Sequence, residues 1–194
     1  EKFLAYHGET LNPDVFTYIQ RDVLSDILGQ MPARAIANVV NRVDSDDALG
    51  LIESLNDELR ADVIRLLSAK MRGTIEEGLS FPEDSAGRLM QREVVAIPQF
   101  WTVGKTMDYF RAAAQTLPDA FLDVFIIDPA HHVVGKIPLS RLVMSGRSEK
   151  VDALSIEETY PVPADMDQEE VALLFKREDL TSAPVVDDNN RLLG

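Results

Sequence analysis

Apolar residues recur at intervals of three and four along the first part of the chain, which is the spacing of one face of an α-helix. Asn12-Pro13-Asp14 is a helix-start pattern, and further starts are expected at Pro32, at Asp44 or Ser45, and at Asn56 or Asp57. The residues predicted to be buried are Val15, Ile19, Val23, Leu24 and Ile27, then Ile36, Val39 and Val40, then Leu49, Ile52 and Leu55, then Leu59, Val63, Leu66 and Leu67. Because the connections are short, neighbouring helices should pack as antiparallel hairpins in a superhelix.

From Val94 the pattern changes to alternating strands and helices, and it occurs twice. The first copy reads VVAIPQFWTVGKTMDYFRAAA and then LDVFIIDPAHHVVGKIPLSRLV; the second reads TYPVPADMDQEEVALLFKRED and then APVVDDNNRLLG. Each copy has a strand ending in Pro, an amphipathic helix, a strand ending in Asp, a turn, and a strand reaching Gly. The first copy continues after its Gly, whereas the second stops at Gly194. We therefore expect the second module to be incomplete and the protein to continue.

These patterns predict an α + α/β fold, in which an all-helical superhelical N-domain precedes a pair of α/β modules. The expected boundaries are residues 1–80 for the helical domain, 81–92 for a junction helix starting at Pro82, 93–150 for the first module and 151–194 for the second. The small residues of PEDSAGRLM in the junction allow another backbone to approach closely.

Composition excludes several functional classes. The chain of 194 residues has a net charge of −14, which argues against nucleic acid and against an anionic membrane surface as partners. Residues 1–90 carry 16 acidic and 9 basic side chains, and residues 91–194 carry 17 and 10. Two acidic bodies repel each other, and divalent cations would reduce that repulsion. No Walker loop, GxSxG or HExxH motif is present, so the sequence does not indicate an enzyme.

The repeated module resembles a pair of CBS modules, the second truncated. The segment FPEDSAGRLM, followed by EVVAIPQFWTVGKTMDYFR, closely resembles the linker and first module of the MgtE family of magnesium channels and transporters. DQEEVALLFKREDLTSAPVVDDNNRLLG resembles that family's second module. The resemblance implies a cytoplasmic, Mg²⁺-sensing regulatory region of a membrane protein. It also implies a homodimer formed through the CBS modules and a transmembrane pore domain beyond Gly194.

The resemblance also suggests metal ligands. Asp167, Glu169 and Asp179 occupy positions at which the family's second module supplies metal-coordinating carboxylates. Asp167 and Asp179 flank one predicted helix and should be about 18 Å apart, so they cannot share an ion. Asp167 has an alternative role as a helix N-cap. Asp179 has a weaker structural role, because an acid at a helix C-terminus opposes the helix dipole, and it is the best single candidate.

In the helical domain, Asp46 and Asp47 are the matching candidates. The family's corresponding helix has carboxylates spaced i and i+4, but here Gly50 follows Asp46 at that distance. One ligand of the family is therefore missing, and helix capping is the alternative role of these acids.

Three hypotheses follow. In the first, Mg²⁺ binds between the helical domain and the CBS pair, and the resulting compaction closes an attached channel. In the second, the modules sense an adenine nucleotide such as ATP. CBS modules often hold the ribose with an Asp after the last strand, but here Arg141 stands at that position. In the third, the chain is a ligand-free interaction domain.

Overall fold

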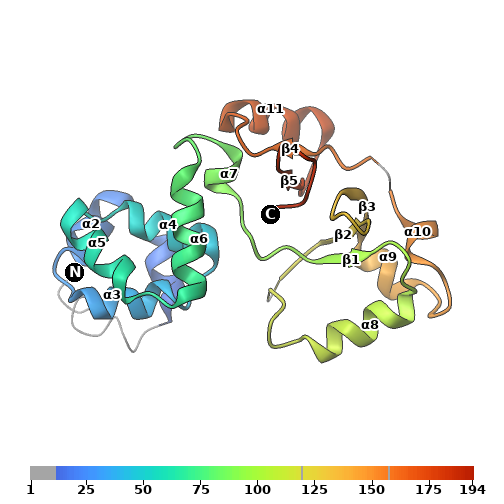
Figure 1. The fold of residues 1–194 in the computed structure, drawn as a ribbon, viewed down its shortest axis with the longest axis horizontal. Coiled ribbons are helices and arrows are strands. Elements are labelled where there is room, and N and C mark those ends of the chain that lie inside the picture. Colours follow the sequence, from blue (N-terminus) through green and yellow to red (C-terminus); the bar gives the residue numbers. More distant parts are fainter. Residues whose placement is uncertain (1–11, 119, 157) are drawn as a thin grey trace. The chain divides into compact units, whose positions relative to one another are not determined.

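The structure is a computed structural model that describes residues 12–118, 120–156 and 158–194. It separates into two compact units, Glu1–Phe81 and Pro82–Gly194 (Figure 1). The first eleven residues of the predicted helical domain lie outside the described residues. Within the described ranges, no helix is both long enough and apolar enough to span a bilayer.

The described residues of the first unit form helices and no strand, as the apolar spacing predicts. Its elements are η2 (Pro13–Tyr18), α2 (Arg21–Leu28), α3 (Ala33–Val40), α4 (Ser45–Glu53), α5 (Asp57–Leu66) and α6 (Ala69–Ser80). The helices from α2 onward have N-caps spaced twelve residues apart, at Gln20, Pro32, Asp44, Asn56 and Ser68. The superhelix is therefore a regular twelve-residue repeat.

One hydrophobic core holds these short helices together. An isolated helix of fewer than about 12 residues is marginal in water, so its stability must come from packing. The side chains that are almost completely buried come from every helix of the unit and include Phe16, Ile27, Leu28, Ile36, Val40, Ile52, Val63 and Ile75.

Two arginines repeat the same contact twelve residues apart. Arg60 in α5 donates to the carbonyl oxygens of Ile52 (3.1 Å) and Leu55 (2.8 Å) at the end of α4. Arg72 in α6 makes the equivalent bonds to the end of α5, from 2.8 to 3.2 Å long. Each guanidinium satisfies carbonyl groups that a helix C-terminus leaves without partners, and its charge is favourable at that end of the dipole.

Two details of the predicted helical pattern are wrong. The first predicted helix is interrupted at Ile19, whose backbone is extended (φ −88°, ψ 137°), and Val15 and Val23 are exposed. The physical reason is that η2 and α2 are separate helices, with α2 starting after its N-cap Gln20. The apolar positions of η2 therefore do not continue on the same face in α2. Leu66 is 51% exposed because Val63 and Leu67 fill the core at this end of α5.

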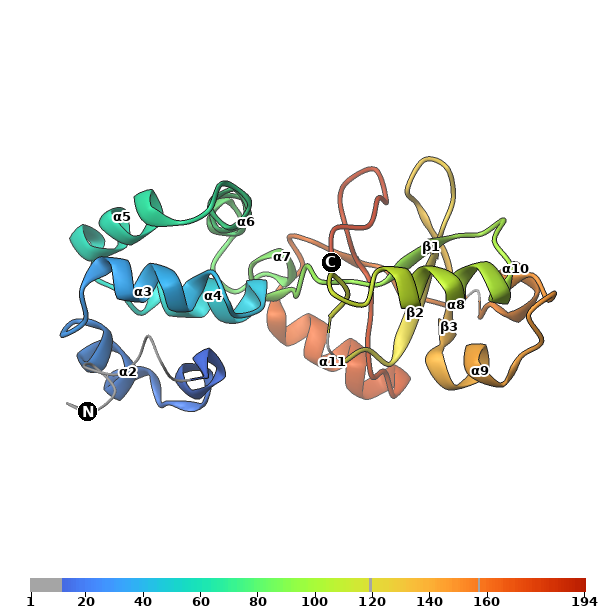
Figure 2. The ribbon, with the colours of Figure 1, turned by 90° about the horizontal axis from the view of Figure 1, so that it is seen from below.

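The second unit contains strands and helices in alternation (Figures 1 and 2). Its elements are α7 (Ala86–Leu89), β1 (Ala96–Pro98), α8 (Val103–Ala112), β2 (Asp123–Ile127), β3 (Val133–Pro138), α9 (Leu139–Met144), α10 (Val151–Leu154), β4 (Val162–Pro163), α11 (Gln168–Glu178) and β5 (Val185–Val186). In the first module, β1 pairs parallel with β2, and β2 pairs antiparallel with β3. In the second, β4 pairs parallel with β5. The α/β prediction is confirmed.

The junction helix is shorter than predicted. It begins at Ala86 rather than Pro82, because Ser85 is its N-cap and accepts a hydrogen bond from the backbone N–H of Arg88. Pro82–Ser85 forms a turn instead, closed by a bond from the Ser85 N–H to the Pro82 carbonyl (3.2 Å).

Alternating side chains of β2 connect the two modules. Val124 and Ile126 are fully buried on the face that packs with Val103 of α8 and Leu142 of α9. Phe125, between them, points to the opposite face and packs against Val186 and Leu192 of the second module. Because successive side chains of a strand point to opposite faces, β2 contributes to one core within the first module and to another between the modules. Gly135 in β3 is required at its position, because a Cβ there would lie 3.0 Å from the Cβ of Ser155.

Contacts between the modules join equivalent positions of the repeat. Ser182 donates to Asp123 (2.6 Å), and an antiparallel bridge joins His132 and Arg191; each pair is 59 residues apart. The two turns also match, since His131 (φ 68°) and Asn190 (φ 60°) are both left-handed. The modules are therefore related by a pseudo-twofold axis, and the predicted turn at Asp187–Asn190 is confirmed.

We predict that Arg60→Ala and Arg72→Ala each lower the free energy of unfolding of the helical unit by about 2 kcal/mol, because buried carbonyl groups lose a charged donor. Arg65→Ala is the matched control, since Arg65 is exposed and its loss should cost less than about 0.5 kcal/mol. Thermal unfolding followed by circular dichroism measures both. Equal effects of all three substitutions would show that the carbonyl contacts of Arg60 and Arg72 do not stabilise the repeat.

A second prediction concerns acid stability. Hydrogen bonds from backbone N–H groups, of His132 to Asp128 and of Arg191 to Asp187, lower the pKa of both carboxyls. A carboxyl with a lowered pKa in the folded state stabilises the protein above its unfolded pKa, and this stabilisation is lost as the pH falls through the folded pKa. We expect Asp128→Asn to be less stable than the unsubstituted protein above about pH 5, with the difference shrinking as the pH falls below the unfolded pKa of about 4 and through the lowered folded pKa. Calorimetry across this range tests the expectation, and a difference that is independent of pH would contradict it.

Candidate functional site

Asp167 and Glu169 lie at the start of α11. Asp167 is the N-cap, and its Oδ1 accepts from the backbone N–H of Glu169 (2.8 Å). The capping role considered from the sequence is therefore present. It does not exclude a metal, because a carboxylate has a second oxygen with free lone pairs. Asp167, Glu169 and the adjacent Glu170 are all exposed.

Asp179 lies at the other end of α11. It is the C-cap and adopts the left-handed conformation (φ 51°, ψ 45°), a position usually taken by Gly. An acid there is unfavourable for two reasons, since its charge opposes the helix dipole and its Cβ disfavours left-handed backbone. Lys176 and Arg177 in the last turn offset part of the first cost. Such a residue is a candidate for function.

The preceding residue belongs to a polar cluster. Hydrogen bonds from Arg177, and then from the Tyr160 hydroxyl, lower the pKa of Glu178. The pKa of Tyr160 is raised because its hydroxyl bonds Glu158 and then Glu178. Tyr160 also has left-handed backbone (φ 48°). Glu158 and Glu178 therefore form an acidic pair at the Tyr160 hydroxyl; the sequence marks Glu178 as the acidic neighbour of Asp179 but does not show its contact with Tyr160.

Asp46 and Asp47 lie in the first turn of α4 in the helical unit. The Oδ1 atom of Asp46 is buried and has no hydrogen-bond partner. Burial is the largest cause of the raised pKa of Asp47, and smaller increases come from the carboxylates of Asp46, Asp44 and Asp14. Asp44 occupies the N-cap position but makes no side-chain capping bond there.

The twelve-residue repeat shows how unusual Asp47 is. In the other helices the equivalent position is apolar, occupied by Val23, Ala35, Leu59 and Met71. Asp46 and Asp47 line a cavity of about 240 Å³. Glu53 lines the same cavity and forms an ion pair of 3.8 Å with Arg21. Asp47 therefore places a negative charge at a position that is apolar in the other helices.

The structure keeps most of the predicted ligands apart. Within the described ranges, no three His, Asp or Glu side chains gather closely enough to hold a metal ion. Asp167 and Asp179 cap opposite ends of α11, so the prediction that they cannot share an ion is confirmed. Mg²⁺ keeps several water ligands and is often bound by one or two carboxylates, so separate carboxylates do not by themselves argue against it.

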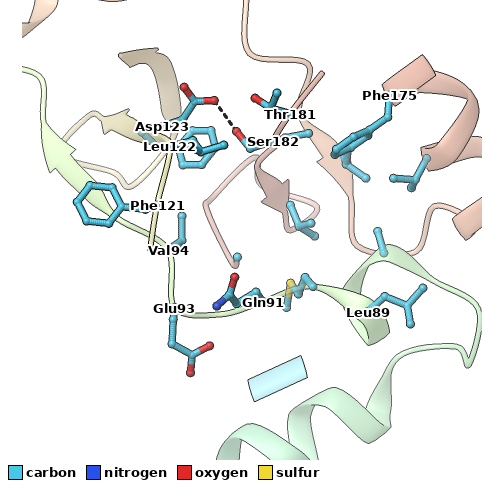
Figure 3. A pocket seen from close by; sticks show the side chains of 18 of the residues that line it. Leu89, Gln91, Glu93, Val94, Phe121, Leu122, Asp123, Phe175, Thr181 and Ser182 are labelled. Atoms are coloured by element: carbon cyan, nitrogen blue, oxygen red, sulfur yellow. Dashed lines mark hydrogen bonds between the residues drawn. The ribbon is translucent and has the colours of Figure 1, made fainter. Parts of the chain in front are cut away.

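A cavity of about 1050 Å³ lies within the second unit and is lined by both modules (Figure 3). In this view, Phe121 and Phe175 lie on opposite sides of the hydrogen-bonded pair Asp123 and Ser182. Asp123 also forms an ion pair of 3.0 Å with Lys136, and both side chains are largely buried. Among the described residues that line the cavity, the charged ones are Glu93 and Asp123, and both are acidic. The sequence signal for this pair was that Asp123 and Ser182 occupy equivalent positions of the repeat.

Two family models match the chain. Residues 1–84 match the MgtE intracellular N domain, and residues 151–194 match the CBS domain. The magnesium transporter MgtE of Bacillus subtilis is 28% identical over 193 residues, covering 100% of this chain and 43% of that protein. MgtE of Thermus thermophilus is 31% identical over 153 residues, covering 78% and 33%. The chain thus spans less than half the length of these relatives.

Solved structures show the same fold. The cytosolic domain of the Mg²⁺ channel MgtE, in complex with ATP, is 25% identical with a TM-score of 0.86, covering 94% of this chain and 74% of that one. The soluble part of a magnesium transporter is 27% identical with a TM-score of 0.89, covering 100% and 78%. A cystathionine beta-synthase (CBS) pair domain from Shewanella oneidensis is 18% identical with a TM-score of 0.58, covering 80% and 89%, and shares the fold alone. The predicted fold class is confirmed.

We predict that Asp47→Asn stabilises the helical unit in the absence of divalent cations, because it removes a partly buried charge that three carboxylates repel. The expected rise in unfolding temperature at pH 7 is about 2 °C. Glu58→Gln is the control, since Glu58 is exposed in the first turn of α5 and should show no such rise. A lower unfolding temperature for Asp47→Asn would mean that the charge of Asp47 is compensated in the folded state.

Proposed function

We propose that this chain, which belongs to the MgtE family through its N domain and CBS region, is the Mg²⁺-sensing regulatory region of a magnesium channel or transporter. The curated relatives are magnesium transporters, and one of the similar structures is described as a cytosolic domain. The predicted location, on the cytoplasmic side of a membrane protein, agrees with that description. The transmembrane pore, its ions and its gating belong to the whole protein and are part of this proposal.

The observation that carries the proposal is the uncompensated acid pair of α4. The Oδ1 atom of Asp46 is buried without a partner, and Asp47 occupies a position that the repeat otherwise makes apolar. A buried polar atom without a partner costs free energy, and a cation that binds the pair would offset this cost. A hydrated divalent cation supplies the missing charge and hydrogen-bond donors.

The charge distribution suggests how binding is converted into a signal. Residues 1–90 and residues 91–194 each carry seven more acidic than basic side chains. Their mutual repulsion favours separation when Mg²⁺ is scarce, and bound Mg²⁺ favours a compact arrangement. Gating then requires only that Mg²⁺ bind the compact arrangement more tightly than the open one. We propose that the compact arrangement closes the pore.

Nucleotide sensing is the second candidate, because a similar structure was solved in complex with ATP. The cavity of the second unit is large enough for a nucleotide, but none of the described residues that line it is Lys, Arg or His. A triphosphate there would meet Asp123 and Glu93 without a compensating cation from the lining residues. Magnesium sensing therefore ranks first.

Self-association is the third part of the proposal. Val143 and Met144 on α9 and Leu173 on α11 are 60%, 81% and 65% exposed. Apolar side chains on the helices of both modules favour contact with a second copy. We propose a homodimer formed through the CBS modules.

The main prediction is that millimolar Mg²⁺ lowers the radius of gyration of the chain, measured by small-angle X-ray scattering. NaCl at the same ionic strength is the control, because it screens exposed charges without binding. Ca²⁺ and ATP form separate arms of the same titration, followed by calorimetry. Compaction by NaCl alone would contradict specific sensing. A response to ATP without Mg²⁺ would favour the nucleotide candidate, and no response to any of them would favour an interaction domain.

Asp179→Gly separates a metal ligand from a structural residue. Gly relieves the left-handed backbone and removes the charge that opposes the helix dipole, so the variant should be more stable by about 0.5 kcal/mol. The same variant should lose part of the Mg²⁺ response. Asp188→Asn, in an exposed turn, is the control and should keep it. A full Mg²⁺ response in Asp179→Gly would show that Asp179 is not a Mg²⁺ ligand.

A further inference from the structure

Helix α11 lies at the outside of the second unit (Figures 1 and 2). None of the residues Gln168–Glu178, all of which the structure describes, is buried. The inner face of the helix lines the cavity of the unit through Val171, Ala172 and Phe175. The opposite face carries Leu173, which is 65% exposed. The helix therefore has a further apolar position on the side that points away from its own module.

The equivalent helix of the first module has a charged residue at this position. The N-caps Thr102 and Asp167 are 65 residues apart, and this spacing makes Asp108 of α8 the equivalent of Leu173. Asp108 is exposed and forms an ion pair of 2.7 Å with Arg147. Both modules thus leave the position at the surface, but the second places a leucine there. A single exposed leucine is common on protein surfaces, so Leu173 indicates an interface only together with its neighbours.

Those neighbours carry charges that are arranged symmetrically about Leu173. Glu169 and Glu170 precede it by four and three residues, and Lys176 and Arg177 follow it by three and four. At these spacings the four charged side chains share one helix face with Leu173. The acids and bases are six to eight residues apart, too far to pair with each other within the helix. Within the described ranges, neither Glu170 nor Lys176 forms an ion pair.

This arrangement is self-complementary when two copies of the helix pack antiparallel. A twofold axis through Leu173 places Glu170 opposite Lys176 of the second copy, and each such pair occurs twice. The two Leu173 side chains then meet at the centre. A parallel pair would instead bring like charges together. Because the chain carries a net charge of −14, two copies repel each other, and complementary charges at the contact offset that repulsion.

The helix dipole explains only part of the pattern. It favours acids near a helix N-terminus and bases near its C-terminus. It does not account for Leu173 at the centre of the face. In α8, moreover, the position equivalent to Glu170 is occupied by Lys105, so the fold does not require an acid there. The dipole and an interface also predict different results when both charges are reversed.

We propose that two copies of this chain associate through antiparallel contact of their α11 helices, with Leu173 on the twofold axis and Glu170 paired with Lys176 of the other copy. This inference rests on the proposed function, because it gives a defined interface to the homodimer proposed there. The contact forms without Mg²⁺, and its test changes none of the proposed metal ligands.

Charge reversal, followed by sedimentation equilibrium of the whole chain in EDTA, tests the pairing. Glu170→Lys and Lys176→Glu should each weaken dimerisation by about tenfold or more, because each places like charges opposite each other twice. The double variant restores both pairs and should return to within about threefold of the unsubstituted protein. If only the helix dipole mattered, the double variant would be the least favourable of the three. A double variant that dimerises no better than the single ones would overturn the pairing.

The central leucine is tested in the same way. Leu173→Asp should weaken dimerisation by about tenfold or more, because it places two carboxylates on the axis in place of an apolar contact. Leu66→Asp is the matched control, since Leu66 is also an exposed leucine (51%) but lies on α5 of the helical unit. It should dimerise as the unsubstituted protein does. Equal loss in both variants would contradict a specific contact at Leu173.

Cysteine cross-linking reports the register directly, because the chain has no cysteine of its own. Leu173→Cys should form a disulfide-linked dimer under mild oxidation, since residues on the axis come within disulfide range. Glu170→Cys should not link to itself, because about 9 Å along the helix separates the two copies of that position. A mixture of Glu170→Cys and Lys176→Cys should form the mixed dimer. Self-linking of Glu170→Cys as readily as Leu173→Cys would overturn the antiparallel register.

The outcomes separate this inference from the proposed function. A chain that stays monomeric at every concentration would overturn both the homodimer and the α11 contact, whereas Mg²⁺ sensing is decided separately by the scattering titration. A dimer that is unaffected by the substitutions on α11 would leave the homodimer standing and overturn the α11 contact.

A chain that dimerises as predicted in EDTA but does not respond to Mg²⁺ would support the α11 contact and contradict the sensing function.

Discussion

The arrangement of the two modules depends on satisfying one buried carboxylate. A charge removed from water must be paired and hydrogen-bonded, or it destabilises the fold by several kcal/mol. Asp123 at the start of β2 meets this requirement with Lys136 of its own module and Ser182 of the other. Because Ser182 occupies the position equivalent to Asp123, the bond also sets where the pseudo-twofold axis passes. The packing of Phe125 against Val186 and Leu192 follows from that placement.

Features that depend on neighbouring residues could be predicted from the sequence. The strand and turn landmarks of both modules, the capping of α11 by Asp167 and the separation of Asp167 from Asp179 all follow from local spacing. The register of the first helix could not be predicted, because Val15 and Val23 fit one apolar stripe although the chain is extended at Ile19. The start of the junction helix was misplaced for a similar reason. Pro82 is compatible with a first turn, but Ser85 supplies the cap.

Features that depend on tertiary contact were missed. Nothing in the local sequence marks Asp123 as bonded to Ser182, or Asp84 as bonded to Gln168, since Ser182 and Gln168 each lie more than fifty residues from their partners. The twelve-residue repeat was visible in principle, because Ile52–Arg60 and Ile64–Arg72 share their pattern of apolar, capping and basic positions. The repeat is clearest in the bonds of Arg60 and Arg72 to helix-end carbonyl groups, and these bonds can be seen only in the structure. The repeat then identifies Asp47 as the exception.

The candidate ligands share a physical property that explains why they stand out. Asp47 replaces an apolar repeat position, and Asp179 places an acid on left-handed backbone at the wrong end of a helix dipole. Each of these acids is unfavourable as long as no cation binds it, and a substitution that removes its charge should stabilise the protein under that condition. A ligand that binds only one arrangement stabilises it by an amount that grows with the logarithm of the ligand concentration, so residues that are unfavourable without the ion increase the difference between the two arrangements. A sensor of a millimolar ion needs a weak site whose occupancy changes with concentration. Carboxylates left partly uncompensated on separate helices provide that property better than a closed cage would.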